Sequence, residues 1–377
     1  MDGDDHPLEG VFVHLTVNEL NKGRKKWRWL VGQAVTEKDG TYSFGNLRPG
    51  QYVVHTLLQP TAKRGSEAPP IEAYLPQYYP NAGDFTSAAR LDLRGLELRA
   101  DFVLSRGRVF SVSGSVKGLL NPYSFHCQFA DAAGQLMTAT GWQYSPDTAQ
   151  FAILMPAGLW TLWCDGSDGT TRAYATREIK VESSNIRGLE LELRQPFDIP
   201  LNEYGAHLSR IDPPTAGLAP EPDYVPVPGA IRGVPPGKYR VKVPSESCVA
   251  SVSSGNTDLL YGDLVVADGA QPVAIRVSRF NKCPTLGGTI HADSGDPWGV
   301  VLLVSDSDHI EPAIVPFNQG RFNTPPIIPG TYHVYAFRSL NELEYANLDA
   351  LREYPSQTVR LEKDQHAIIN LELIQKR

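Results

Sequence analysis

The sequence predicts an all-β chain of four tandem Ig-like or transthyretin-like β-sandwich domains. Short segments along the whole chain alternate apolar with polar residues, and this period of two is typical of half-buried strands. The 33 Gly and 30 Pro among 377 residues favour frequent turns and disfavour long helices. One local motif, an alternating segment followed by a corner and a second alternating segment, also occurs four times. We therefore expect a row of related small β-domains.

The repeated motif is clearest around Pro49-Gly50. Tyr42 and Phe44 alternate with small or polar residues before this corner, and Tyr52 resumes the alternation after it. Proline presets its own φ and glycine adopts a positive φ without steric cost, so the pair favours a tight turn. We expect each copy to form a β-hairpin. The corner glycines of the four copies are Gly50, Gly158, Gly237 and Gly330.

The spacing of the corners gives each domain room for about seven short strands, the number in a sandwich. The expected domains are residues 1–107, 108–195, 196–282 and 283–377. The second and fourth domains open with a strand, at 109–116 and 284–291, whereas the first begins one strand later. We expect either that the natural protein continues upstream or that the first domain lacks its opening strand. An absent edge strand would leave backbone donors and acceptors exposed.

The remaining elements follow from alternation and from turn-forming residues. Strands are expected at 11–17, 27–31, 95–104, 125–129, 160–164, 186–193, 273–277, 299–304 and 368–373, and the third copy of the hairpin at 231–243. The proline-rich segment 213–222 predicts a loop. Residues 344–354, with Leu348 and Leu351 three apart, form the one helix candidate.

The cysteines fall into two pairs of similar separation, one in each of two domains. Zinc knuckles need closely spaced cysteines, and these are far apart in sequence. We predict two intradomain disulfides, Cys127 with Cys164 and Cys248 with Cys283. The alternative is four buried free thiols. Disulfides would place the chain in an oxidising compartment.

Composition argues against several classes of function. The net charge is −7 and no basic run is longer than Arg24-Lys25-Lys26, so nucleic acid is not the expected partner. No stretch approaches the roughly 18 consecutive apolar residues of a membrane span. The first six residues are acidic and polar, unlike a signal peptide. The sequence contains no Gly-x-Ser-x-Gly, His-Glu-x-x-His or glycine-rich phosphate loop, so we expect no enzyme, no cofactor and no metal.

Aromatic residues of the first domain are the best ligand-binding candidates. Tyr74, Tyr78 and Tyr79 lie in a proline-bounded loop, where exposed aromatics commonly bind ligands, and Trp27 could stack on a sugar ring. The alternative is that these side chains cover the sheet or pack in its core. Residues 306–311, Asp-Ser-Asp-His-Ile-Glu, contain oxygen ligands for a hard cation, but a solvated turn has the same composition.

The pattern Thr36-x-x-x-Gly40-x-Tyr42-x-Phe44-x-x-Leu47-x-Pro49-Gly50-x-Tyr52 resembles the carboxypeptidase regulatory-like domain. That family has a transthyretin-like sandwich fold, which also occurs in starch-binding-like and bacterial surface β-domains. The resemblance covers about 8–118 best, 284–375 less closely and 119–280 least. Bacterial secreted proteins carry such domains in tandem. The resemblance implies a non-catalytic accessory or binding module that is exported.

These observations predict an extracytoplasmic structural or binding protein, secreted, periplasmic or on the cell surface, with a protein or glycan partner. A monomer is favoured, and the short links between domains predict an elongated rod. The alternative is a carbohydrate-binding accessory region of a larger secreted protein. An enzyme is the third and least favoured interpretation.

Overall fold

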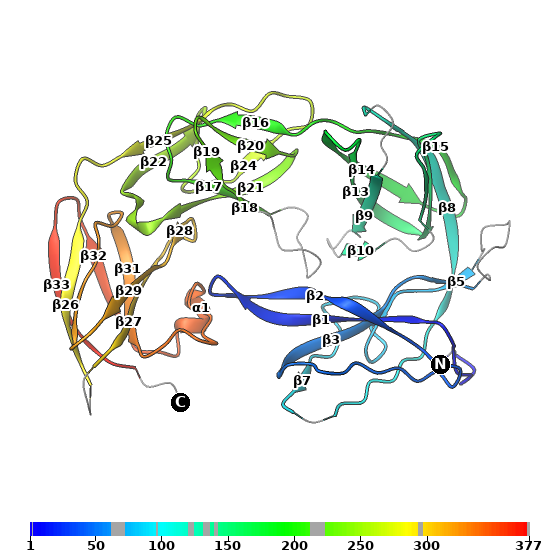
Figure 1. Cartoon of the computed structure of the whole chain (residues 1–377), viewed down its shortest axis with the longest axis horizontal. Coiled ribbons are helices and arrows are strands. Elements are labelled where there is room, and N and C mark those ends of the chain that lie inside the picture. Colours follow the sequence, from blue (N-terminus) through cyan, green and yellow to red (C-terminus); the bar gives the residue numbers. More distant parts are fainter. Residues whose placement is uncertain are drawn as a thin grey trace. The chain divides into compact units, whose positions relative to one another are not determined.

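The computed structural model describes residues 1, 3–61, 72–95, 97–119, 124–130, 136–138, 142–211, 223–292 and 297–374 (Figure 1). These residues are mostly strands and connecting loops, which confirms the all-β prediction. The chain divides into two compact units, one mainly of residues 1–196 and the other mainly of residues 197–377. The predicted loop at 213–222 lies outside the described residues.

The expected helix at 344–354 is a single turn. Among the described residues α1 (Leu348–Leu351) is the one α-helix, and its first turn is capped by the side chain of Asn347. Pro355 follows closely and disfavours helical backbone at the residue before it. The prediction of a longer helix was therefore wrong.

The first region, residues 1–107, forms a sheet around β1 (Phe12–Asn21) and β3 (Gly50–Thr56). The sheet order is β2 (Arg24–Val35), β1, β3 and β6 (Gln77–Tyr78), and β7 (Leu91–Leu93) also pairs with β3. Alternate residues of β1 point into one core with aromatic side chains from later segments. This core contains Val11, Val13, Leu15, Val17, Ala34, Tyr52, Val54, Tyr74, Phe102 and Leu104.

Two segments of the first region that were expected to be strands are not strands. Residues 41–45, before the first corner, have no strand structure, and neither do the described residues of 95–104. Their alternation is nevertheless real, because Phe102 and Leu104 are buried while Asp101 and Val103 are exposed. Their side chains therefore face the core as predicted, but their backbones lack the neighbouring strand that would make them part of a ladder.

The second region, residues 108–195, contains two sheets over one core. One sheet has the order β10 (Leu136–Thr138), β9 (Ser124–Ala130), β13 (Gly158–Ser167) and β14 (Arg172–Val181). In the other, β8 (Arg106–Lys117) pairs antiparallel with β12 (Gln150–Pro156) and parallel with β15 (Ile186–Glu192). The same sheet extends through β11 (Gln143–Ser145) on one side and through β5 (Glu72–Tyr74) and β4 (Gln59–Pro60) on the other.

The third region, residues 196–282, packs its sheets over one shared core. β16 (Phe197–Pro200), β20 (Ala230–Val234) and β19 (Pro226–Val227) form one sheet, and β22 (Val249–Ser254) pairs with β23 (Thr257–Asp258) and β25 (Ile275–Arg279). A further sheet has the order β18 (Asp223–Tyr224), β17 (His207–Arg210), β21 (Gly237–Pro244) and β24 (Leu264–Val266). Tyr239 and Val241 of β21 are fully buried in this core.

The fourth region, residues 283–377, has the most regular pairing. β26 (Thr285–His291) lies between β30 (Arg321–Asn323) and β33 (His366–Glu372), antiparallel to the first and parallel to the second. The facing sheet has the order β29 (Ala313–Phe317), β27 (Gly299–Ser305), β31 (Gly330–Phe337) and β32 (Gln357–Leu361). Leu286 and Tyr332, one from each sheet, are fully buried between them.

The repeated corners are not hairpins. β12 and β13, β20 and β21, and β30 and β31 each belong to two different sheets. The corner therefore carries the chain from one layer of a region to the other. Both flanking segments can then point apolar residues into the same core from opposite sides, which the alternation in the sequence does not distinguish from a hairpin.

A shared hydrogen bond fixes all four corners. In each copy the aromatic residue two positions after the corner glycine donates to the carbonyl of the residue four positions before it. The bonds are Tyr52 Oη to Arg48 O (2.6 Å), Trp160 Nε1 to Pro156 O (3.0 Å), Tyr239 Oη to Pro235 O (2.7 Å) and Tyr332 Oη to Ile328 O (2.7 Å). In the third and fourth copies the accepting carbonyl belongs to a buried residue, Pro235 or Ile328, and is thereby satisfied away from water.

Two disulfides join all four cysteines in the predicted pairs, Cys127 with Cys164 and Cys248 with Cys283. Cys127 and Cys164 lie directly opposite each other on β9 and β13 and are buried in the second core. Cys248 follows β21, and Cys283 lies in the link between β25 and β26. The second disulfide therefore holds the start of the fourth region against the third. Both bonds indicate an oxidising environment.

Candidate functional site

Trp27, one of the predicted ligand-binding residues, lies on β2 in a small aromatic cluster. Its half-buried ring is 5.3 Å from that of Phe85, edge to face. The guanidinium carbon of Arg90 lies 4.7 Å from the centroid of Trp27 and 4.3 Å from that of Phe85. Such cation–π contacts stabilise both groups by about 0.5–1 kcal/mol where they are exposed. We call Trp27, Tyr78, Phe85 and Arg90 the Trp27 cluster.

Tyr78 forms the floor of this cluster. Its side chain is buried, and its ring lies 6.0 Å from the ring of Phe85 and 5.2 Å from that of His55. His55 in turn stacks on His14 at 5.7 Å. Burial lowers the pKa of His14 to about 4, and burial together with the neighbouring His14 lowers the pKa of His55 to about 3. Both imidazoles are therefore neutral at physiological pH.

The other two predicted residues point elsewhere. Tyr74 is buried in the first core, where Arg106 lies over its ring at 5.2 Å and bonds its hydroxyl through Nη2 at 3.0 Å. Tyr79 packs against Phe102 at 6.1 Å on the side of the same core. Consecutive residues of an extended segment point to opposite faces, so the side chains of Tyr78 and Tyr79 lie on different sides of the segment. The structure thus brings Trp27 and Tyr78 together and places Tyr74 and Tyr79 in a different cluster.

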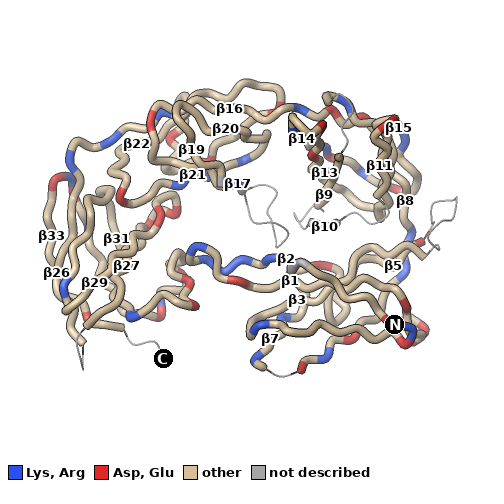
Figure 2. Tube along the Cα trace, viewed as in Figure 1, with Lys and Arg blue, Asp and Glu red and all other residues tan. Residues whose placement is uncertain are grey.

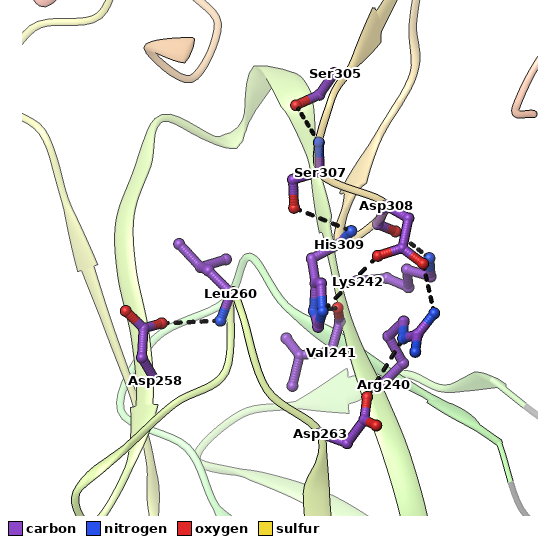
Figure 3. A network of polar contacts seen from close by, with 10 residues as sticks. All are labelled: Arg240, Val241, Lys242, Asp258, Leu260, Asp263, Ser305, Ser307, Asp308 and His309. Carbon is purple, nitrogen blue, oxygen red and sulfur yellow. Dashed lines mark hydrogen bonds and ion pairs between the residues drawn. The ribbon is translucent and has the colours of Figure 1, made fainter. Parts of the chain in front are cut away.

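The acidic loop at 306–311 is engaged in contacts with the third region (Figure 3). Asp308 Oδ2 lies 2.5 Å from Arg240 Nη1, and Arg240 Nε also pairs with Asp263 at 3.3 Å. His309 is buried and its Nδ1 lies 3.1 Å from the carbonyl of Val241. The loop therefore docks on β21, an arrangement that the sequence analysis did not consider.

Lys242 completes the docking contact. Its ammonium group donates to the main-chain carbonyl of Asp308. Burial lowers the pKa of Lys242 to about 8, although Asp308 acts in the opposite direction. Immediately afterwards, β28 (Ile310–Glu311) pairs parallel with Val243 and Pro244 at the end of β21. Polar and main-chain contacts together join the third and fourth regions.

The other acidic side chains of the loop are also paired. Asp306 Oδ1 lies 2.9 Å from His333 Nε2, and Glu311 lies 3.5 Å from His207. Across the described part of the chain, no three His, Cys, Asp or Glu side chains form a group that could hold a metal ion. Lys and Arg, like Asp and Glu, are scattered along the described trace of each unit (Figure 2).

The second unit carries exposed aromatic residues that were not among the predicted site residues. Trp298 is 58% exposed, with the guanidinium of Arg338 5.1 Å from its ring, and Tyr261 is 83% exposed. Trp298 sits in a Pro-Trp-Gly sequence just before β27, and this loop composition was the available signal. No helix in the described ranges has the length and apolar character needed to cross a membrane.

Comparison with known proteins gives no family assignment. No protein-family model matches the chain, and no curated protein matches it. Among solved structures, the Bacillus anthracis TIE protein aligns over 97% of this chain and 69% of its own, with 10% identity and a TM-score of 0.17. A proposed adhesin from Bacteroides ovatus aligns over 51% of this chain and 88% of its own, with 14% identity and a TM-score of 0.18.

Proposed function

We propose that the chain is a non-catalytic, extracytoplasmic protein that presents four tandem β-sandwich domains of the carboxypeptidase regulatory-like type to a protein partner at the cell surface. The observation that carries this proposal is that neighbouring regions inside each unit are joined by strand pairing, buried apolar contacts or a disulfide; we call each such set of contacts a lock. Regions joined in this way keep binding surfaces at fixed positions, which a scaffold requires and separate flexible modules do not provide.

In the first unit the lock is a shared strand with a small apolar junction. β8 pairs with β5 of the first region near its start and with β12 and β15 of the second region further on. Leu58 and Ala73 pack there against Val109 and Leu154, all buried. In the second unit the lock consists of the Cys248–Cys283 disulfide, the β21–β28 pairing and Ile328, which is buried in the core of the third region.

Calorimetry of the oxidised chain tests the locks. We expect two cooperative transitions, one for each unit, because each pair of regions shares buried contacts. Val109→Asp places a charge in the apolar junction and should split the first transition in two. Val103→Asp, at a residue 36% exposed, is the matched control and should leave it single. Four independent transitions in the unmodified chain would contradict the proposal.

A carbohydrate-binding role is the second candidate, and the Trp27 cluster favours it. An aromatic ring held by neighbours and partly open to solvent can stack on a sugar ring. Titration of the chain with polysaccharides should then change tryptophan fluorescence, and Trp27→Ala should abolish the change. Trp298→Ala, which removes an exposed tryptophan of the other unit, is the control. No response to any polysaccharide would leave the scaffold role alone.

A further inference from the structure

The two disulfides differ in how far they are open to solvent. Cys127 and Cys164 are 8% and 2% exposed, and their side chains face the second core from β9 and β13. Cys248 and Cys283 are half-buried, and both lie outside strands. A thiolate reduces a disulfide by direct attack on one of its sulfur atoms, so access to sulfur controls the rate. The first bond is therefore shielded while the second region is folded, whereas the second bond can be reached in the folded protein.

The turn that carries Cys248 also contacts the fourth region. It is the 3₁₀ turn η1 (Ser245–Ser247), which follows β21, and Cys248 ends it. Ser245 is fully buried, and its carbonyl accepts a hydrogen bond from Ile328 N of the fourth region at 2.8 Å. One short turn of the third region thus holds the fourth region at two points, Ile328 through a hydrogen bond and Cys283 through the disulfide.

The backbone of Cys248 is held in an unfavourable conformation. Its φ of 58° and ψ of 28° are left-handed, which a residue with a Cβ adopts only at a cost in free energy. Two restraints act on it, the disulfide and the hydrogen bond from Phe280 N to Cys248 O at 3.0 Å. Phe280 O also lies 3.7 Å from the sulfur of Cys248, within reach of the thiol that reduction would produce. Breaking the disulfide therefore allows the turn to relax and leaves the freed cysteine an acceptor.

Ile328 connects this turn to the corner of the fourth region. Its side chain is buried in the core of the third region, and its carbonyl accepts from Tyr332 Oη at 2.7 Å. Tyr332 is itself fully buried in the fourth core. The disulfide, η1, Ile328 and the corner therefore form a continuous series of contacts between the two cores. A separate contact, from Val243 N to His309 O at 2.8 Å, accompanies the pairing of β21 with β28 and does not depend directly on the disulfide.

We propose that the Cys248–Cys283 disulfide is a redox-sensitive latch, which thiol reductants open in the folded protein and which then loosens the fourth region from the third. The inference rests on the locks of the proposed function and states how one of them is regulated. A reductant thiolate attacks one sulfur and forms a mixed disulfide as the S–S bond of the protein breaks. A second reductant thiol displaces the remaining cysteine. The reductant leaves as a disulfide, and its two electrons and two protons end on the two cysteine thiols.

The first measurement is the rate at which each bond opens in dithiothreitol, followed by mass spectrometry of the alkylated full chain. We expect Cys248 and Cys283 to be alkylated at least tenfold faster than Cys127 and Cys164. Urea below the unfolding transition should accelerate only the opening of Cys127–Cys164, because that bond is exposed by unfolding. Equal rates for the two bonds, or opening of Cys248–Cys283 that requires urea, would overturn the proposal.

Hydrogen exchange of the selectively reduced chain measures the loosening. The amides of Ile328 and Val243, whose acceptors lie across the junction of the third and fourth regions, should exchange at least fivefold faster than in the oxidised chain. The amides of Ile290 and Thr324, which donate to carbonyls of the fourth region at 2.8 Å, are the internal controls and should not change. Unchanged exchange at Ile328, or an equal increase at the control amides, would overturn the proposal.

Replacing Cys248 and Cys283 together by Ser opens the latch without a reductant and should reproduce the exchange of the reduced chain. If this variant fails to fold, the reduced natural chain still gives the measurement. The calorimetric test of the scaffold uses only the oxidised chain. Two transitions there with equal reduction rates here would therefore reject the latch alone, and four transitions there would reject the scaffold whatever the reduction rates.

Discussion

The first and fourth regions contain the same corner motif and the same closing pattern, yet only the fourth builds regular strands from them. Phe322 lies on β30 and pairs with Gly288, whereas Tyr42 lies in a segment without strand structure. The difference is β26, which supplies hydrogen-bond partners to both flanks. A strand is therefore a property of a pair of segments, and alternation of side chains records only which face is buried.

The largest expected effect on this comparison comes from a substitution that prevents β26 from pairing with its neighbours. Gly288→Val would force a side chain against Ile369 O, so we expect the fourth region to lose about 4 kcal/mol or to fail to fold. Chemical denaturation monitored by circular dichroism measures the effect. Gly45→Val in the first region, where a Cβ meets nothing within 4 Å, is the control and should cost about 1 kcal/mol or less. Equal losses at the two sites would contradict the comparison.

Removing one disulfide distinguishes the two units. Replacing Cys127 and Cys164 together by Ala should destabilise the first unit by about 3 kcal/mol, because the unfolded chain is no longer constrained. The transition of the first unit in denaturant should move, and that of the second unit, which keeps the Cys248–Cys283 disulfide, should not. An equal shift of both transitions would contradict this expectation.

Acid should act on the first region through its histidine pair. The unfolded chain binds protons near the ordinary histidine value of 6.5, whereas burial holds the folded pKa of His14 at about 4 and that of His55 at about 3. The two neutral histidines therefore cost the first region no free energy of unfolding above pH 6.5. As the pH falls toward 4 the free energy of unfolding decreases, by about 2 kcal/mol for each histidine at pH 5. Denaturation between pH 7.5 and pH 5 measures this slope.

The matched variant for the acid effect is His55→Leu. It should reduce the pH dependence of the first region by about half, whatever its own cost in stability. An unchanged slope in this variant would exclude the histidine pair as the cause.

The smallest effects should come from the corner hydroxyls. Tyr332 is fully buried, so Tyr332→Phe leaves the Ile328 carbonyl without its donor and should cost about 1–2 kcal/mol. Tyr52→Phe, in the region without a complete sheet, should cost about 0.5–1 kcal/mol because Arg48 is exposed to water. Urea denaturation resolves the difference. A larger loss at Tyr52 would reverse the proposed order.

Residue patterns predicted much of this architecture. Alternation located β1, β8, β9, β13 and β26, and placed Cys127 and Cys164 on inward faces. The alternation of apolar and polar residues does not indicate which sheet a strand joins, so the corners were predicted to be hairpins. Alternation also does not reveal whether a segment has a neighbouring strand to pair with. For this reason 95–104 was expected to be a strand.

The candidate site was less predictable. Tyr78 and Tyr79 looked equivalent as loop aromatics, but their adjacent positions send them to different clusters. The polar composition of the loop at 306–311 favoured a solvated turn. In the structure His309 is buried beside the Val241 carbonyl of β21, which belongs to another region. Long-range docking leaves no local pattern in a single sequence.

The strand β8 has a consequence for how such chains can be rearranged. The boundary expected at 107/108 falls inside it, one residue before the strand changes its partner from β5 (residues 106–108) to β12 (from Val109 on). Inserting or deleting one residue there would turn every side chain on one half to the opposite face. Recombination that exchanges a single region at a boundary within β8 would therefore destabilise the product. The smallest segment that can be transplanted intact is the pair of regions that share this strand.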